Sequence, residues 1–194
     1  MKSLYDFIVS PIGQRYNNKK SVDNKELILN SNIETFQSVN KKAVVISTPR
    51  VYKGNIEEGD VVYVHHNVFR RFYDIKGKEK NSRSYFKDNL YFCDPLQIYM
   101  YNNKSHLNYC FVSPLKNKDS LSTSIEQNQL GILKYGNKSL DAIKIKPGAL
   151  VTFSPDSEFE FLIKGEKLYC MKFNNIALVH EHERNTKEHN PSWA

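Results

Sequence analysis

Histidine has the clearest potential for metal chemistry in this chain, and five of its six histidines are grouped in two places. His65 and His66 follow the apolar segment VVYV. Neighbouring side chains of an extended chain point to opposite faces, so we expect that these two cannot bind one metal ion without a turn. His180, His182 and His189 lie in a polar tail, where alternate residues could take up a stray divalent ion. We favour a surface or packing role for the pair and a solvated tail for the others.

Other signatures of catalysis are missing from the sequence. It contains no nucleophile elbow, phosphate-binding loop, paired zinc-ligand spacing or compelling carboxylate pair. Three cysteines, Cys93, Cys110 and Cys170, cannot all pair with one another, and none has the Cys-x-x-Cys spacing of zinc or redox sites. We therefore expect a protein that is not an enzyme, has no metal or cofactor of its own, and lies in a reducing cytoplasm.

The segment FRRFYD places two arginines, Arg70 and Arg71, among three aromatic residues. Such a mixture could stack on nucleic acid, but it more often fills a rim or a subunit interface. The net charge of +7 could also indicate a nucleic-acid partner, yet basic residues are mixed with acids, as in IKGKEKNSR. We favour the rim or interface role and do not expect a nucleic-acid partner, with a basic single-strand binder as a remaining alternative.

The chain repeats itself in three pairs of segments that occur in the same order. The pairs are YDFIVSPI (5–12) with NYCFVSPL (108–115), IEEGDVVYV (56–64) with IKPGALVTF (145–153), and LYFCDPLQIYMY (90–101) with LYCMKFNNIALV (168–179). Each segment is short, rich in Val, Ile, Tyr and Phe, and bounded by Gly, Pro, Asn or Asp, which is typical of strands. The repeat predicts two units of related structure.

These patterns predict an all-β protein of two tandem small barrels or sandwiches. We expect the first unit to span 1–103 and the second 104–181, with a polar tail over 182–194. The junction falls in YNNKSHLN, whose residues suit an exposed connection. No apolar run approaches the roughly 20 residues that cross a bilayer, so we expect no membrane partner.

A hydrophobic triplet stands inside the polar segment VDNKELILNSN (22–32), at Leu27, Ile28 and Leu29. A polar loop with one apolar triplet can add itself to a hydrophobic groove on a partner. The alternative is a short buried strand, which is the commoner fate of three aliphatic residues in a β protein. Spacing alone favours the buried strand.

The order of these pieces resembles the GroES co-chaperonin family. In the second unit the matching pieces are Gly131-Ile132-Leu133 with Gly136-Asn137, then Ile145 to Phe153, and finally Ile176 to Val179. Ala149 stands where the family usually has Asp after the turn glycine, whereas the first unit keeps Gly59-Asp60 but lacks Gly-Asn in the preceding turn. The resemblance covers nearly all of residues 4–181, by the order of patterns more than by identity.

This resemblance implies two tandem GroES-like β-barrels, the first with a long mobile loop over 13–40. In the family such a loop carries an aliphatic tripeptide that docks into the chaperonin GroEL, and Leu27, Ile28 and Leu29 stand in that place. With the resemblance, docking becomes the favoured role of the triplet. The equivalent segment of the second unit is shorter and has only the isolated Leu121 and Ile125. We expect only the first unit to dock.

The resemblance thus implies a co-chaperonin that caps a GroEL-type chaperonin and assists ATP-dependent folding of phage proteins. ATP would be bound and hydrolysed by the chaperonin and not by this chain. We expect a homo-oligomeric ring and, because the divergent motifs resemble phage-encoded versions of the family, an origin in a bacteriophage and a location in the host bacterial cytoplasm. The alternative is a non-enzymatic phage structural or adaptor protein that reuses the barrel for assembly.

Overall fold

The computed structural model describes residues 2–16, 19–22, 25–28, 38–117 and 126–180, with the backbone alone in 19–22 and 25–28. The chain divides into two compact units, Met1–Asn102 and Asn103–Ala194. This division lies one residue before the boundary that the sequence analysis places between 103 and 104.

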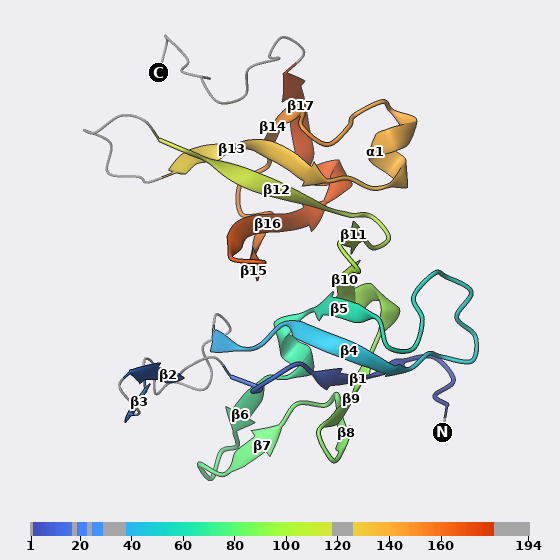
Figure 1. The fold of residues 1–194 in the computed structure, drawn as a ribbon, viewed down its shortest axis with the longest axis vertical. Coiled ribbons are helices and arrows are strands. Elements are labelled where there is room, and N and C mark those ends of the chain that lie inside the picture. The colour runs from blue at the N-terminus through green and yellow to red at the C-terminus, as the bar shows by residue number, and fades with distance from the viewer. Residues whose placement is uncertain (1, 17–18, 23–24, 29–37, 118–125, 181–194) are drawn as a thin grey trace. The chain divides into compact units, whose positions relative to one another are not determined.

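The described part of the first unit, drawn in blue to green in Figure 1, consists of short strands and 3₁₀ turns. Its elements are β1 (Phe7–Pro11), β2 (Lys19–Val22), β3 (Lys25–Ile28), β4 (Lys42–Ser47), β5 (Val61–Val64), η2 (His66–Val68), β6 (Arg71–Tyr73), β7 (Glu79–Asn81), β8 (Tyr85–Lys87), β9 (Leu90–Cys93), η3 (Pro95–Gln97) and β10 (Ile98–Tyr101). Strands β10, β5, β4, β1, β9 and β8 are neighbours in this order in one antiparallel sheet. Two hairpins, β2–β3 and β6–β7, form small sheets of their own.

Side-chain alternation along these strands builds the core of the first unit. In β4, Ala43, Val45 and Ser47 are buried while Ile46 is 45% exposed, which is the period-two pattern of a half-buried strand. Aromatic residues close the core, because the ring of Phe69 meets that of Tyr91 edge to face with centroids 4.8 Å apart.

The second unit, drawn in yellow-green to red, is also built mainly of strands. They are β11 (Lys104–Ser105), β12 (Tyr109–Lys116), β13 (Glu126–Tyr135), α1 (Lys138–Ala142), β14 (Leu150–Phe153), β15 (Phe159–Ile163), β16 (Glu166–Lys172), η4 (Phe173–Asn175) and β17 (Ile176–His180). The large sheet runs β15-β16-β12-β13-β14-β17. Asn137 caps α1, since its side chain accepts the N–H of Leu140 at 2.9 Å.

The two large sheets have the same strand order. When β8, β9, β1, β4, β5 and β10 of the first unit are matched with β15, β16, β12, β13, β14 and β17 of the second, every neighbour in one sheet corresponds to a neighbour in the other. The three repeated sequence segments fall on β1 and β12, on β5 and β14, and on β9 to β10 and β16 to β17. The match extends to a 3₁₀ turn between the last two strands of each unit, η3 in one and η4 in the other.

The glycine turn before β5 and β14 is built with the same hydrogen bonds in both units. Gly59 donates its N–H to the carbonyl of Val45, and Gly148 donates to Leu133, each at 2.8 Å. Both glycines have φ above +90°, at +91° and +96°, a left-handed conformation that costs a residue with a Cβ atom more than glycine. The glycine therefore allows the chain to re-enter the sheet after a tight turn.

The all-β prediction is confirmed, since strands dominate and the only α-helix of the described residues is the five-residue α1. Within the described ranges no pairing joins β8 to β10 or β15 to β17, so each large sheet is open and not closed into a barrel. No helix in those ranges has the length and hydrophobicity that a membrane crossing requires.

Replacing Gly148 by alanine tests this turn. An added Cβ would meet no atom within 4 Å, so only the backbone conformation at φ +96° resists the change. We expect Gly148→Ala to lower the free energy of unfolding by about 1–2 kcal/mol, measured by urea denaturation followed by circular dichroism. Gly136→Ala is the control: its Cβ would lie 3.8 Å from Leu133 Cδ2 and its φ is not positive. Equal losses in the two variants would contradict the backbone explanation.

Candidate functional site

The segment with the hydrophobic triplet leaves the first sheet after β1 and returns at β4, the neighbouring strand. We call residues 13–40 the excursion. Leu27 and Ile28 belong to β3, and in the ladder they pair with Lys20 and Lys19 of β2. Their side chains, and the whole of Leu29, lie outside the described residues. The docking role of the triplet therefore stays a prediction.

Asn40 closes the base of the excursion. This side chain is 6% exposed, and its Nδ2 donates to the carbonyls of Ile12 and Gln14 at 2.8 and 2.9 Å. Its Oδ1 accepts the N–H of Lys42 at 2.9 Å, and its own N–H donates to the carbonyl of Arg15 at 3.0 Å. The Asn40 side chain thus forms hydrogen bonds with backbone C=O and N–H groups at the point where the excursion leaves the sheet.

The outgoing and returning segments of the excursion also contact each other next to Asn40. Tyr16 and Val39 form an isolated antiparallel bridge, and their side chains are 4% and 3% exposed within the core of the first unit. We call Arg15, Tyr16, Val39 and Asn40 the stem. Because its apolar members belong to the core, the origin of the excursion is fixed by the same packing that holds the sheet.

Arg15 fastens the stem to the segment that follows η2. Its guanidinium donates to the carbonyls of Phe69 and Arg70, at 2.5 and 3.0 Å, and to Oδ1 of Asn81 at 2.6 Å. It also lies over the ring of Tyr91, 5.2 Å from its centroid. Burial lowers the pKa of Arg15 from its ordinary value, and the electron-rich oxygens and ring around it compensate for the lost water.

Tyr16 makes the second connection to this segment. Its hydroxyl accepts the N–H of Arg71 at 2.6 Å, and the Arg71 guanidinium lies 4.5 Å from the centroid of the Tyr16 ring. Nη1 of Arg71 also donates to Glu79 Oε1 at 2.9 Å. The structure thus uses the FRRFYD segment to hold the stem, a contact that lies within one unit.

The two neighbouring histidines do not point apart as the sequence analysis expects. At His66 the extended chain turns into η2, and the rings of His65 and His66 stack with centroids 4.1 Å apart. Nδ1 of His65 accepts the N–H of Asn67 at 3.0 Å, so this nitrogen carries no proton. The expectation of opposite faces is wrong because the chain does not stay extended through both residues. Only His65 is extended, and the 3₁₀ turn η2 begins at His66.

The pKa values of both histidines are lowered from the ordinary value. Burial, followed by the nearby His65, Lys41 and Arg70, lowers the pKa of His66 to about 4. Burial and Lys41 lower the pKa of His65 as well. The described residues contain no cluster of three or more potential metal ligands. His180 is the last residue of β17, and its Nε2 lies 2.9 Å from Thr152 Oγ1. His182 and His189 are outside the described residues.

The three cysteines are buried and unpaired with each other. Burial raises the pKa of the Cys110 thiol to about 12, and it raises those of Cys93 and Cys170 as well. Since the thiolate is the reactive form, none of the three is activated as a nucleophile at neutral pH.

The chain matches no protein-family model, and the search of curated proteins gives no significant match.

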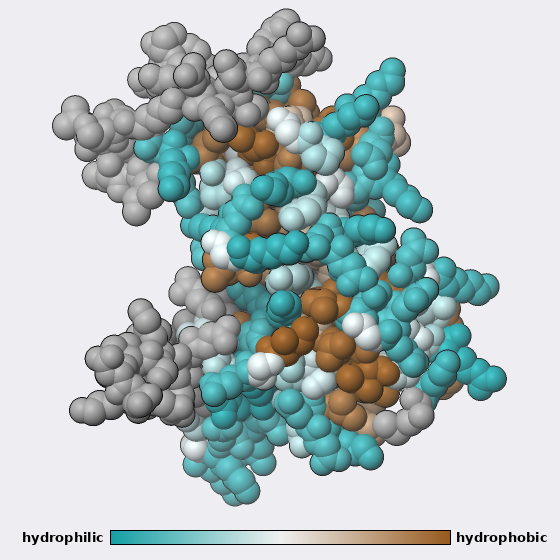
Figure 2. Space-filling model, in the orientation of Figure 1, coloured by the Kyte–Doolittle hydropathy of each residue, from teal (hydrophilic) through white to brown (hydrophobic). Residues whose placement is uncertain are grey.

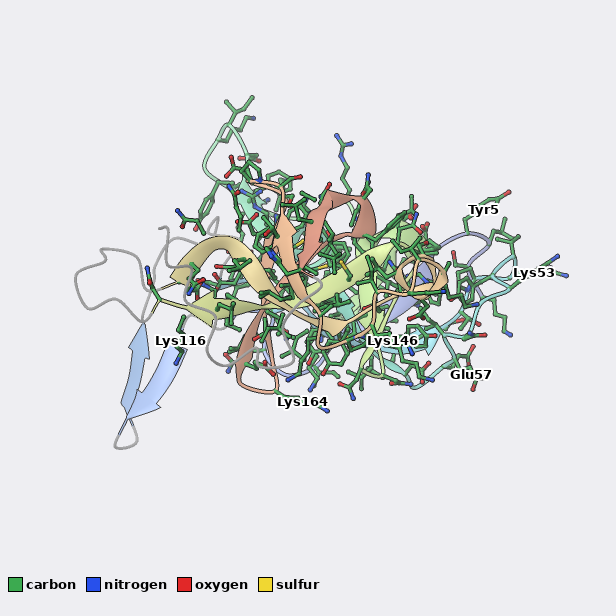
Figure 3. The ribbon with its side chains drawn as sticks, turned by 90° about the horizontal axis from the view of Figure 1, so that it is seen from above. Tyr5, Lys53, Glu57, Lys116, Lys146 and Lys164 are labelled. Atoms are coloured by element: carbon green, nitrogen blue, oxygen red, sulfur yellow. The ribbon has the colours of Figure 1, made fainter. Side chains whose placement is uncertain are left out.

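Tyr16→Phe tests the stem. The substitution removes the hydroxyl that accepts the Arg71 N–H at a side chain only 4% exposed, and leaves that N–H without its partner. We expect the free energy of unfolding to fall by about 1–3 kcal/mol, measured by denaturant titration. Tyr5→Phe is the matched control, because Tyr5 is 69% exposed and reaches away from the chain in Figure 3; it should change stability by less than about 0.5 kcal/mol. Similar values for both variants would argue against the stem.

The histidine pair predicts a pH dependence of stability. The folded-state pKa of His66, about 4, lies below the unfolded value of roughly 6.5, so folding favours the neutral ring. The resulting stability is present above the unfolded pKa and is lost as the pH falls from about 6.5 towards 4. His66→Gln cannot titrate, and its free energy of unfolding should fall less steeply over this range, by about 1–2 kcal/mol in total after allowance for partial exposure. Parallel curves for the two proteins would contradict this origin.

Proposed function

We propose that this protein is a co-chaperonin that caps a GroEL-type chaperonin through the excursion and assists ATP-dependent folding of phage proteins. The observation that carries the proposal is the construction of the first unit, in which a long segment with the triplet Leu27, Ile28 and Leu29 starts from a fixed, buried stem on adjacent strands. A fixed base with a long arm is the arrangement that a docking segment needs.

The shared strand order of the two units supports a tandem GroES-like architecture. The order of pieces that resembles the family runs twice along the sequence, and each run folds into a sheet with the same neighbours. The glycine turn, which the resemblance places before the third strand of the large sheet, recurs at Gly59 and Gly148 with matching hydrogen bonds. The two large sheets are open among the described residues. We therefore propose that each unit is an open variant of the closed barrel that the resemblance implies.

The excursion has the physical properties of a docking arm. Burying an aliphatic side chain in a groove contributes about 1.5–3 kcal/mol, and ordering a free segment offsets part of this. The backbone of Leu27 and Ile28 is already extended and paired with β2, which reduces the ordering cost. Several copies on one ring would turn individually weak contacts into firm capping by effective concentration.

The second unit contrasts with the first at the same topological position. Only residues 117–125 separate β12 from β13, whereas 12–41 separate β1 from β4. Its isolated Leu121 and Ile125 lie outside the described residues. In the proposed function the second unit is a structural partner and the first unit alone docks.

Self-assembly into a ring belongs to the proposal. Exposed aliphatic side chains occur on both units, including Ile46 at 45% and Val51 at 55% in the first, and Leu178 at 60% in the second. Figure 2 shows a hydrophobic area on the first unit where β4 lies in Figure 1. Such areas suit contacts between copies. Since whole chains carry two units each, a seven-unit ring would need seven chains with their second units outside it.

The alternative is a non-enzymatic phage structural or adaptor protein. One observation favours this alternative: Leu27 and Ile28 belong to a regular strand, β3, which is paired with β2. A strand at this position is what the buried-strand interpretation of the triplet expects. In that case the hairpin would pack against a virion partner and not against a chaperonin.

Replacing Leu27, Ile28 and Leu29 together by serine tests the proposed function. The measurement is co-sedimentation with the GroEL-type chaperonin of the protein's own host, with and without ATP. We expect nucleotide-dependent binding of the wild type and at least a hundredfold weaker binding of the triple variant, since three aliphatic contacts are lost.

The control variant carries Leu121→Ser and Ile125→Ser, which change the corresponding segment of the second unit and should leave chaperonin binding unchanged. Circular dichroism of all three proteins verifies that each is folded. Wild-type protein that fails to bind the chaperonin would reject the co-chaperonin proposal and favour the structural role.

A further inference from the structure

A pocket of about 450 Å³ opens on the first unit, on the side of the β6–β7 hairpin. Its walls come from η2, β6, η3 and the connection from β7 to β8. The lining residues are Asn67, Arg70, Phe72, Ser82, Arg83, Ser84 and Gln97. We call this the Arg70 pocket. Its volume lies within the usual range for sites that bind a small molecule or one unit of a polymer.

The Arg70 pocket is positively charged. Its lining contains two arginines and no carboxylate. The surrounding segment 66–87 is also basic, with Arg70, Arg71, Lys76, Lys78, Lys80, Arg83 and Lys87 against Asp74 and Glu79, in a chain of net charge +7. Figure 2 colours the β6–β7 hairpin as hydrophilic surface. Seven basic and two acidic residues give this segment five of the chain's seven net positive charges, and the segment contains both pocket arginines.

Both acidic residues of this segment are already engaged. Glu79 pairs with Arg71 at 2.9 Å. Asp74 accepts the N–H groups of Lys76 and Lys78 through Oδ1 and lies 3.9 Å from Lys80 Nζ. The charges of the two pocket arginines are thus left for an external anion.

Arg70 has an unused hydrogen-bond donor. Its backbone is fixed, because its N–H donates to His66 and its carbonyl accepts from Arg15. Its Nε is buried and has no hydrogen-bond partner. A buried guanidinium N–H without an acceptor is costly. The Arg70 guanidinium also lines the pocket, and its geometry matches phosphate and carboxylate groups.

Neutral donors complete the lining. Gln97 is oriented by η3, where its Oε1 accepts the N–H of Asp94 at 3.1 Å, so that its NH₂ end is the donor. Ser84 adds a hydroxyl to the wall, while Ser82 already donates its own to the carbonyl of Val68 at 2.7 Å. Guanidinium, amide and hydroxyl groups together form the donor set that phosphate oxygens accept from.

An aromatic residue distinguishes this pocket from a simple anion site. Phe72 lines it and is 41% exposed. An exposed aromatic ring in a basic pocket provides a stacking platform for a base. An acidic peptide would use the charge and leave the ring in water, so the combination favours a nucleotide.

We propose that the Arg70 pocket binds single-stranded nucleic acid, with Arg70 and Arg83 on a phosphodiester and Phe72 stacked on an adjacent base. This activity goes beyond the proposed co-chaperonin function and does not depend on it.

The test uses the full chain and fluorescence anisotropy with labelled single-stranded DNA and RNA oligonucleotides at several salt concentrations. The variant Arg70→Gln/Arg83→Gln removes two positive charges from the pocket. The control Lys53→Gln/Lys164→Gln removes the same charge elsewhere, at two exposed side chains that extend away from the ribbon in Figure 3. Phe72→Leu removes the stacking ring and keeps the charge.

We expect at least tenfold weaker binding for the pocket variant, and a slope of log K against log salt that is less negative by about 0.7, since the two arginines bind one phosphate and each phosphate contact on a single strand contributes about 0.7. The control should lie within about twofold of the wild type, and Phe72→Leu should bind about tenfold more weakly with an unchanged salt slope. If Arg70→Gln alters the fold, Arg83→Gln and Phe72→Leu alone carry the test.

Three outcomes would overturn the proposal: no binding by the wild type, equal losses in pocket and control variants, or competition by polyglutamate as strong as that by an unlabelled oligonucleotide. The last result would assign the pocket to acidic peptides. Competition by a mononucleotide and by inorganic phosphate shows whether the pocket recognises a whole nucleotide or only its phosphate. If phosphate competes as well as the mononucleotide at the same concentration, the proposed role of the base is rejected. The serine triplet variant should bind the oligonucleotide as the wild type does, so this test is independent of chaperonin binding.

Discussion

The first unit depends on pairing the backbone groups where its chain leaves the sheet. A segment that departs between two adjacent strands exposes N–H and C=O groups at the sheet edge, and buried groups of this kind must find partners. Asn40 supplies them for Ile12, Gln14 and Lys42. Because the stem is closed in this way, the length of the excursion adds only a slowly growing entropy cost, and the sheet is unaffected by what lies beyond it.

The two units show how one strand order accommodates different connections. Their large sheets have matching neighbours and matching glycine turns, so the repeated residues are those that build the sheet. The units differ in their connections: the excursion and the β6–β7 hairpin both belong to the first unit, and these carry the two proposed sites. Insertions fall in connections because a connection can lengthen without disturbing strand pairing.

Local patterns made much of the fold predictable. Alternating apolar residues and the glycine turns at Gly59 and Gly148 act within a few residues, and they indicate the strands and the repeat directly. The site could not be read in the same way. Arg15 contacts Phe69 and Arg70, which are 54 and 55 positions away, and no local pattern signals such contacts.

The histidine pair was mispredicted because periodicity extends a strand past the point where η2 begins. The basic charge of 66–87 looked mixed because its acids are interleaved in sequence, although Asp74 and Glu79 are engaged in the fold.

The stem and the Arg70 pocket meet at one residue. Arg15 binds the carbonyl of Arg70, while the Arg70 side chain lines the pocket. The hydrogen bonds that fix the origin of the excursion therefore also fix the backbone from which the pocket arginine extends. A change at Arg15 must reach both sites, whereas a change at the exposed Arg83 alters only the charge of the pocket. The stem thus supports both the excursion and the backbone of the pocket arginine. A substitution that affects only one of the two proposed sites must therefore lie away from the stem.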